Sequence, residues 1–253
     1  MTPEERSRAL EQIANEVRVC TRCRLHQGRT NAVPGEGHPE TEVVFVGEGP
    51  GFNEDQQGRP FVGAAGNLLT ELIGTVGWRR DEVFITNVVK CRPPGNRDPE
   101  PDEIQACRPY LRRQLEALDP ALIVTLGRIS LDTFMPGARI GAVHGTARPV
   151  DPGTGAATAM SYAMYHPAAA FRQQALRDTL FAEMTDVPAT LVDARERRAE
   201  SSVGTPVAAE TTGTTSIPAE SAAVAPGAQR PQGAQLAPGA PVAPGDHQLD
   251  LFR

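Results

Sequence analysis

The sequence EVVFVGEGPG at residues 42–51 decides the fold of the chain. Its first part, Glu42–Gly47, is a short β-branched run that ends in glycine, which is typical of a buried strand. Two similar runs, VFITN at 83–87 and ALIVTLG at 121–127, and a weaker one at 158–165 predict three more strands. Because segments of helical periodicity lie between these runs, we expect a mostly parallel sheet covered by helices on both faces.

The predicted fold is therefore an α/β fold, a three-layer α/β/α sandwich around a central, mostly parallel four-stranded sheet. Helices are expected at 65–76, at 102–118 with an interruption or restart at Pro109, and at 168–184. Strands and helices together make one predicted globular domain at 1–190. In parallel sheets, ligands bind outside the carboxyl ends of the strands, so we expect the functional residues there.

Composition narrows the class of protein. The 253 residues carry 25 Lys plus Arg against 31 Asp plus Glu. The resulting net charge of −6 argues weakly against a protein that coats nucleic acid, but it leaves room for a local basic patch. No apolar run reaches the length of a membrane span, and the N-terminus lacks the layout of a secretory signal. We therefore expect a cytoplasmic protein without a membrane partner.

The composition changes after about residue 190. The segment 191–247 is rich in Ala, Pro and Gly, and it has no aromatic residue from 201 onward. Such a segment cannot bury enough apolar surface to offset the entropy of ordering it, so the sequence predicts a disordered linker and tail. The chain then ends on QLDLFR at 248–253.

Polar side chains stand at the ends of the predicted strands. Glu48 and Gly49 lie in a glycine-rich turn, where backbone N–H groups can approach an anion, but the turn has neither Walker nor dinucleotide-binding spacing. Asn87 offers donors and an acceptor suited to the edge of a base or an amide. His166 lies between a strand and a helix. From position alone, Glu48 could instead cap its turn, Asn87 could be a turn residue, and His166 could be structural.

The cysteines form a separate set: Cys20 and Cys23 in a CxxC, then Cys91 and Cys107. This is not the paired-knuckle pattern of a zinc ribbon, and four thiolates can also hold an iron–sulfur cluster. The spacing does not choose between the two metals. Four coincidental buried thiols are disfavoured, because the CxxC lies in a polar, arginine-rich stretch.

Three long motifs and the cysteines together resemble the family 4 uracil-DNA glycosylases, the iron–sulfur branch of that superfamily. The motifs are GEGPGFNEDQQGRPFVGAAGNLL at 47–69, ITNVVKCRPPGNRDPEPDEIQACRPYL at 85–111 and HPAAAFR at 166–172. The family commonly has Ala at Gly49, a change that we expect not to matter. A related branch that traps DNA covalently has a basic insertion near Cys91. This chain lacks it, so the resemblance implies a turnover enzyme.

The resemblance implies a DNA repair enzyme that flips uracil out of DNA and hydrolyses its N-glycosidic bond, leaving an abasic site. It implies a monomer without lyase activity, holding one structural 4Fe–4S cluster on the four cysteines. It assigns catalysis to Glu48, His166 and Asn96, contact with the base to Phe61, Asn87, Glu54 and Gly49, and contact with DNA to Arg92, Arg97 and Arg172.

Each implied role has a physical basis. Phe61 would stack on the flipped base, Asn87 would pair with uracil O4 and N3–H, and Glu54 would stand near the edge where thymine carries its methyl. His166 would hydrogen-bond O2 as charge develops, and Glu48 would position water. The three arginines would bind phosphates or fill the gap that the flipped base leaves in the duplex. Alternatively, each could be a solvated surface residue. The competing interpretations are a non-enzymatic binder of damaged or single-stranded DNA and an iron–sulfur electron carrier.

The C-terminal peptide carries a second resemblance. QLDLF is similar to the peptide by which bacterial repair and replication proteins bind the sliding clamp. Its anchors would be Gln248, Leu249, Leu251 and Phe252, displayed on the linker as short linear peptides display theirs. The alternative is a chance apolar end.

Overall fold

The computed structural model describes residues 1–203. Most of the predicted linker and the whole predicted clamp peptide, with Gln248, Leu249, Leu251 and Phe252, lie outside the described residues. Within the described part, no helix is both long and apolar enough to cross a membrane.

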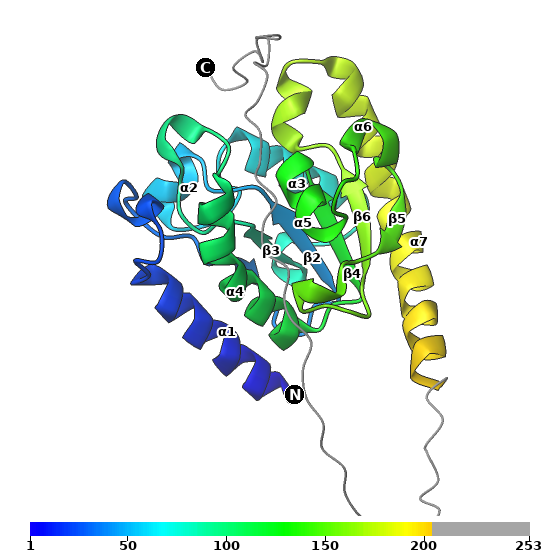
Figure 1. The fold of residues 1–253 in the computed structure, drawn as a ribbon. Coiled ribbons are helices and arrows are strands. Elements are labelled where there is room, and N and C mark those ends of the chain that lie inside the picture. The colour runs from blue at the N-terminus through cyan, green and yellow to red at the C-terminus, as the bar shows by residue number, and fades with distance from the viewer. Residues whose placement is uncertain (204–253) are drawn as a thin grey trace, which may run out of the picture. The chain divides into compact units, whose positions relative to one another are not determined.

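A mixed six-stranded sheet forms the centre of the fold (Figure 1). The strands are β1 Glu36–Gly37, β2 Val43–Gly47, β3 Phe84–Asn87, β4 Leu122–Leu126, β5 Ala147–Pro149 and β6 Met160–Met164, in the order β1-β3-β2-β4-β6-β5. The four predicted strands are the inner four and are mutually parallel. The α/β fold class is therefore confirmed, but the sheet has two more strands than predicted, both antiparallel at its edges.

The helices form the outer layers. They are α1 Pro3–Arg18, α2 Phe52–Gln57, α3 Ala64–Thr75, α4 Pro101–Leu118, α5 Arg128–Phe134, α6 Ile140–Val143 and α7 Gln174–Val203. Short 3₁₀ turns lie at Arg24–Gln27, Arg80–Glu82, Pro94–Asn96, Pro152–Thr154 and Pro167–Phe171.

Two hydrophobic clusters bind these layers to the sheet. On β2, Val43 and Phe45 point to the cluster that contains residues of α3 and α7, whereas Val44 and Val46 point to the cluster of α1, α4 and α5. This alternation is the period of two expected for a strand buried on both faces. Figure 1 shows α1 and α4 together on one side of the sheet and α7 on the other. The predicted three-layer arrangement is present.

Three helical predictions need correction. α4 is continuous through Pro109, because this proline lies on the exposed face, where water can bind the carbonyl that loses its partner. The closing helix predicted at 168–184 is instead a 3₁₀ turn followed by α7 from Gln174. α7 also runs beyond the expected boundary at 190, since Leu191 and Ala194 are buried in the core.

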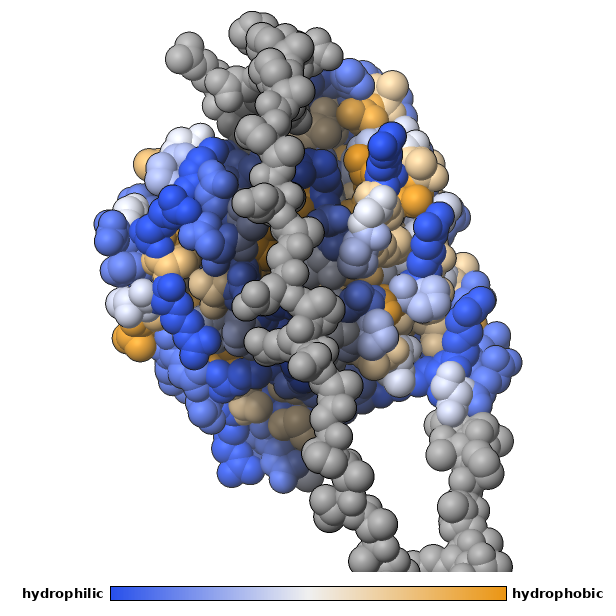
Figure 2. All heavy atoms as spheres, in the orientation of Figure 1, coloured by the Kyte–Doolittle hydropathy of each residue, from blue (hydrophilic) through white to orange (hydrophobic). Residues whose placement is uncertain are grey.

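The part of the surface that is visible in Figure 2 is mostly hydrophilic, with hydrophobic residues in small separate groups. The apolar side chains of the described residues lie mainly in the two clusters around the sheet.

Candidate active site

The carboxyl edge of the parallel strands brings the predicted site residues together. β2 ends at Gly47, which is in register with Asn87 at the end of β3. Gly127 follows β4, and His166 lies just beyond β6. A Cβ at Gly47 would lie 2.5 Å from both Asn87 Oδ1 and Phe61 Cζ, and one at Gly127 would lie 2.9 Å from the Cβ of His166. Glycine at both strand ends therefore lets the three side chains converge.

Phe61 is fixed against His166. The two ring centroids are 5.8 Å apart, with the ring planes inclined by 29°. Phe61 is buried and has a φ of +50°, a left-handed conformation that few bulky residues adopt. Helix α3 accommodates this turn because Gly66 has no side chain where the Phe61 backbone approaches it. The ring is thus held as a rigid wall of the site.

Asn87 presents an unpaired hydrogen-bond acceptor. Its side chain is only 1% exposed, and its Oδ1 has no hydrogen-bond partner. Buried polar atoms in proteins are nearly always paired, so an unpaired one in a site indicates a place for a ligand donor. The Asn87 carbonyl oxygen accepts a hydrogen bond of 2.8 Å from Lys90 Nζ, which holds the turn after β3.

His166 is a neutral donor. Its Nδ1 accepts a hydrogen bond of 3.1 Å from the Ala168 N–H, so the proton of the neutral ring lies on Nε2. Burial lowers the pKa of His166 to about 4, although the negative charge of Glu54 opposes this shift. The imidazole is therefore uncharged near neutral pH and has one N–H to donate.

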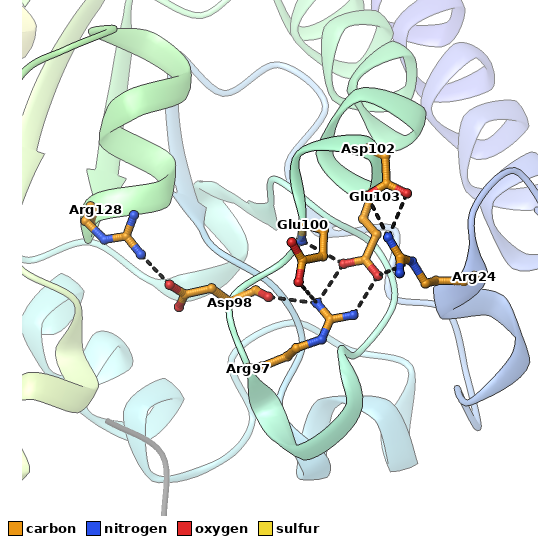
Figure 3. A network of polar contacts seen from close by, with 7 residues as sticks. All are labelled: Arg24, Arg97, Asp98, Glu100, Asp102, Glu103 and Arg128. Atoms are coloured by element: carbon orange, nitrogen blue, oxygen red, sulfur yellow. Dashed lines mark hydrogen bonds and ion pairs between the residues drawn. The ribbon is translucent and has the colours of Figure 1, made fainter. Parts of the chain in front are cut away.

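Glu48 is a carboxyl group that titrates near neutrality. Burial and, to a smaller extent, the negative charge of Asp98 raise its pKa to about 7, against the opposing effect of the positive charge of Arg128. Asp98 and Arg128 form an ion pair with each other (Figure 3). A side chain whose pKa has moved into the physiological range is typical of proton-transfer sites.

Glu54 ties two parts of the site together. Its Oε2 accepts a hydrogen bond of 3.1 Å from the Gly51 N–H, at the start of α2. Its Oε1 accepts bonds of 2.8 Å from the N–H groups of Val62 and Gly63, which follow Phe61. Glu54 thus holds the segment that carries Phe61, and its position beside the 5-carbon of a base stays a prediction.

The buried carboxylate of Glu103 anchors the loop that follows β3 (Figure 3). Arg97 binds its two oxygens at 2.7 and 2.9 Å, the Glu100 N–H donates to it at 2.8 Å, and Arg24 adds an ion pair at 3.3 Å. The Arg97 guanidinium holds the pKa of Glu103 below its usual range, against the opposing effect of burial. Arg97 also donates to the carbonyl oxygen of Asp98. The network therefore includes Asp98, the residue whose charge raises the pKa of Glu48.

The three predicted DNA-contact arginines differ in their surroundings. Arg97 is bound to Glu103, whereas Arg92 Nε donates to Asn96 Oδ1 at 2.7 Å. Arg172 is exposed at the end of the 3₁₀ turn after His166. Contact of these arginines with DNA and a catalytic role for Asn96 stay predictions.

Gly49 is more constrained than expected. A Cβ there would lie 2.8 Å from Cγ2 of Val89, so alanine would require Val89 to shift. The glycine turn is therefore packed tightly against the loop after β3.

The four cysteines line one cavity. Cys20 and Cys23 follow α1, Cys91 follows β3, and Cys107 lies in α4, with Val17, Lys90, Ala106 and Tyr110 around them. Three N–H groups point at sulfur atoms: Arg29 Nη1 to Cys91 at 3.0 Å, the Lys90 amide to Cys107 at 3.3 Å and the Arg22 amide to Cys20 at 3.5 Å. Within residues 1–203, no three His, Cys, Asp or Glu side chains converge closely enough to hold a single metal ion.

Lys90 and the Asp98–Arg128 pair belong to the site but are not among the residues expected from the sequence. Lys90 is the only lysine of the chain, it is fully buried, and its Nζ donates to Thr86 Oγ1 at 2.6 Å. Burial lowers its pKa to about 8. Its uniqueness among 24 arginines was a signal, whereas nothing in the sequence pairs Asp98 with Arg128.

Comparison with known proteins agrees with this architecture. A model of the uracil DNA glycosylase superfamily matches residues 34–187. The chain is 46% identical to the type-4 uracil-DNA glycosylase of Archaeoglobus fulgidus over 175 residues, covering 67% of the chain and 87% of that relative. It is 49% identical to the type-4 uracil-DNA glycosylase of Thermotoga maritima over 146 residues, covering 58% and 76%.

A higher identity is found over a shorter stretch. The chain is 65% identical over 123 residues to the type-4 uracil-DNA glycosylase of Sulfurisphaera tokodaii, covering 48% of the chain and 56% of that relative. The matched stretch thus spans a little over half of the relative's length. The chain belongs to the uracil-DNA glycosylase superfamily and, within it, to the type-4 glycosylases.

Proposed function

We propose that the protein excises uracil from DNA by hydrolysing the N-glycosidic bond, leaving an abasic site for base excision repair. The observation that carries this proposal is the buried, unpaired Oδ1 of Asn87 beside the Phe61 and His166 rings. A base can reach this site only after it has left the duplex stack, so the proposal includes base flipping.

Recognition of uracil follows from its donors and acceptors. Asn87 Oδ1 accepts the uracil N3–H, and the amide nitrogen donates to O4. Cytosine inverts this pattern, because its N3 is an acceptor and its N4 is a donor, so it would leave the buried Asn87 atoms unpaired. The Phe61 ring stacks on the base.

Cleavage leaves negative charge on the uracil ring and positive charge on the sugar. The Nε2–H of neutral His166 donates to O2 as the ring becomes negative, a stabilisation that a preorganised donor supplies at no cost in reorganisation. Glu48, as a carboxylate, positions the attacking water and stabilises the cationic sugar. Asn96 supports this arrangement through Arg92, and Glu54 through the segment of Phe61.

Glu48→Gln tests this function against the alternative of a non-enzymatic DNA binder. We expect wild-type protein to release uracil from an oligonucleotide, and the variant to bind the same oligonucleotide with similar affinity while losing most turnover. A pure binder would release no uracil in either form. Equal turnover by the two proteins would contradict the role of Glu48.

We also propose that Cys20, Cys23, Cys91 and Cys107 hold a 4Fe–4S cluster. The donor set supports this, because four thiols from three separate segments surround one cavity and three N–H groups point at their sulfur atoms. The cluster would join the N-terminal segment to the loop after β3. Iron and acid-labile sulfide analysis tests this, and zinc in their place would contradict it.

We propose further that the enzyme has no lyase activity. Cleavage of the abasic strand by a lyase uses an amine that forms a Schiff base with the sugar. Lys90, the only lysine, is buried and donates to Thr86 and Asn87. Borohydride should therefore trap no covalent complex with abasic DNA, and a trapped complex would contradict the proposal.

The partner proposed for residues 248–252 is the bacterial sliding clamp. Its support is the sequence QLDLF alone. Deletion of 248–252 should abolish pulldown with a purified clamp and leave excision from free oligonucleotides unchanged. Deletion of five linker residues at 233–237 is the control and should leave pulldown intact. Survival of pulldown without the peptide would contradict the proposal.

A further inference from the structure

We propose that Phe52 and Arg92 form a stacking site for the nucleobase that neighbours the excised uracil. This inference rests on the proposed function. It adds a stacking contact that does not depend on which base is present and that holds the DNA strand next to the flipped nucleotide.

Phe52 is exposed where a buried ring would be the norm. Its side chain is 56% exposed, and among residues 1–203 the only other exposed aromatic residue is Phe171. Phe52 begins α2, directly after the glycine turn that carries Glu48. Single exposed apolar residues are common on protein surfaces, so exposure alone assigns no role to Phe52. A role for the ring is indicated instead by the arginine that covers one of its faces and by its position beside the glycine turn.

The ring is held in place from one side. The Arg92 guanidinium lies over it, 5.1 Å from the ring centroid. Arg92 is itself oriented by Asn96, whose Oδ1 accepts from Nε at 2.7 Å and whose φ is +56°. The chain thus supports the ring through a planar cation, while more than half of the side chain remains open to solvent.

The two residues come from loops that are packed together beside the catalytic groups. Gly49, between Glu48 and Phe52, approaches Val89 and Pro93 so closely that a Cβ there would lie 2.8 and 3.8 Å from their side chains. A base stacked on Phe52 would therefore lie next to the glycine turn, where the sugar of the flipped nucleotide must pass.

The charge of Arg92 fits a nucleic-acid strand. In the described part of the chain Arg92 enters no ion pair, in contrast to Arg97 on the same loop. An aromatic face beside an unneutralised arginine is the combination that binds single-stranded nucleic acid, since every base offers a π-face and every linkage a phosphate. The occupant is therefore an unpaired or partly unstacked base of the substrate strand.

The test removes the ring and, separately, the base. Full-length, cluster-loaded wild type, Phe52→Ala, Phe52→Trp and the control Val192→Ala, an exposed apolar residue on α7, are compared on three oligonucleotides. One carries a single uracil among normal bases. The other two replace the 5′ or the 3′ neighbour of the uracil with a tetrahydrofuran spacer. The quantity measured is kcat/KM for uracil release.

We expect Phe52→Ala to lower kcat/KM on the intact oligonucleotide by roughly 5-fold or more, which corresponds to the lower end of base–aromatic stacking. The loss should vanish on one of the spacer substrates, which also identifies the stacked neighbour. Phe52→Trp should retain activity, and Val192→Ala should match wild type on all three.

Two results would overturn the inference while the proposed function stands. One is equal activity of wild type and Phe52→Ala on the intact oligonucleotide. The other is an equal loss on all three substrates, which would show that the ring acts without a neighbouring base. Failure of wild type to release uracil from any substrate would instead contradict the proposed function, and this inference with it.

Discussion

The carbonyl oxygen of Phe61 lies so close to the α-carbon of Gly66 that a Cβ at Gly66 would stand 1.9 Å from it. The contact joins the left-handed turn of Phe61 to the first turns of α3. A glycine in a helix is normally a destabilising choice, so its presence here reflects the space that the Phe61 backbone occupies.

Gly66→Ala should therefore displace Phe61. We expect the free energy of unfolding to fall by about 1–3 kcal/mol and uracil release to fall with it, because the Cβ meets backbone rather than a movable side chain. Gly74→Ala in the same helix is the matched control, since nothing lies within 4 Å of its Cβ. It should stabilise the protein by about 0.5–1 kcal/mol in denaturant unfolding. Similar effects of the two substitutions would refute this account.

The pH dependence of excision should follow Glu48. Because its carboxylate form acts and burial raises its pKa to about 7, kcat/KM should rise with pH through about 7. Asp98→Asn removes a charge that raises this pKa, so its profile should move to lower pH. Arg128→Ala removes a charge that lowers it and should move the profile to higher pH. Shifts of the two variants in the same direction would contradict this assignment.

His166 should act on kcat rather than on binding. Its Nε2–H meets charge that develops only during bond cleavage, so His166→Ala should lower kcat by about 10²–10³-fold. The KM should change little. Since the pKa of His166 is lowered to about 4, the wild-type profile should show no inflection from it between pH 6 and 8. A loss confined to KM would argue for a binding role instead.

The ion pair of Glu103 with Arg97 should contribute more to the stability of the fold than an ion pair on the surface does. Glu103→Ala removes the buried carboxylate to which Arg97 donates two hydrogen bonds, and it should lower the free energy of unfolding by about 3 kcal/mol. Glu116→Ala breaks the exposed pair with Arg112 on the same helix and should cost about 0.5 kcal/mol or less. Denaturant unfolding of both variants compares them directly, and equal costs would contradict a structural role for Glu103.

The predictable part of the fold is the part with local signals. Strands such as β2 and β4 are apolar runs buried on both faces, and each was found within one residue or so of its bounds. The edge strands β1 and β5 have two and three residues and no alternation, so only pairing with a neighbour defines them. α1 was missed although Thr2 and Glu5 form a capping box, because only Ile13 and Val17 are buried.

The site divides in the same way. Asn87 and His166 lie at the carboxyl ends of parallel strands, which meet at one edge of the sheet, so the predicted topology is enough to bring them together. Glu48 and Phe61 are indicated by the sequence motifs. Asp98 and Arg128, whose charges act on the pKa of Glu48 in opposite directions, form an ion pair that joins a loop to α5, and no sequence motif indicates this pair. Glu54 accepts hydrogen bonds from the N–H groups of Gly51 and Gly63, which lie in two different segments. These contacts depend on the geometry of a turn that no sequence pattern predicts.

The most direct test of the account is the release of free base from end-labelled oligonucleotides that carry one U, one T or one C. The protein is used as the full chain with its iron content measured, and alkali then cleaves any abasic site. We expect release of uracil and alkali-dependent cleavage at U alone. Absence of cleavage at U by cluster-loaded protein, or equal cleavage at U and C, would contradict the reading of uracil by Asn87.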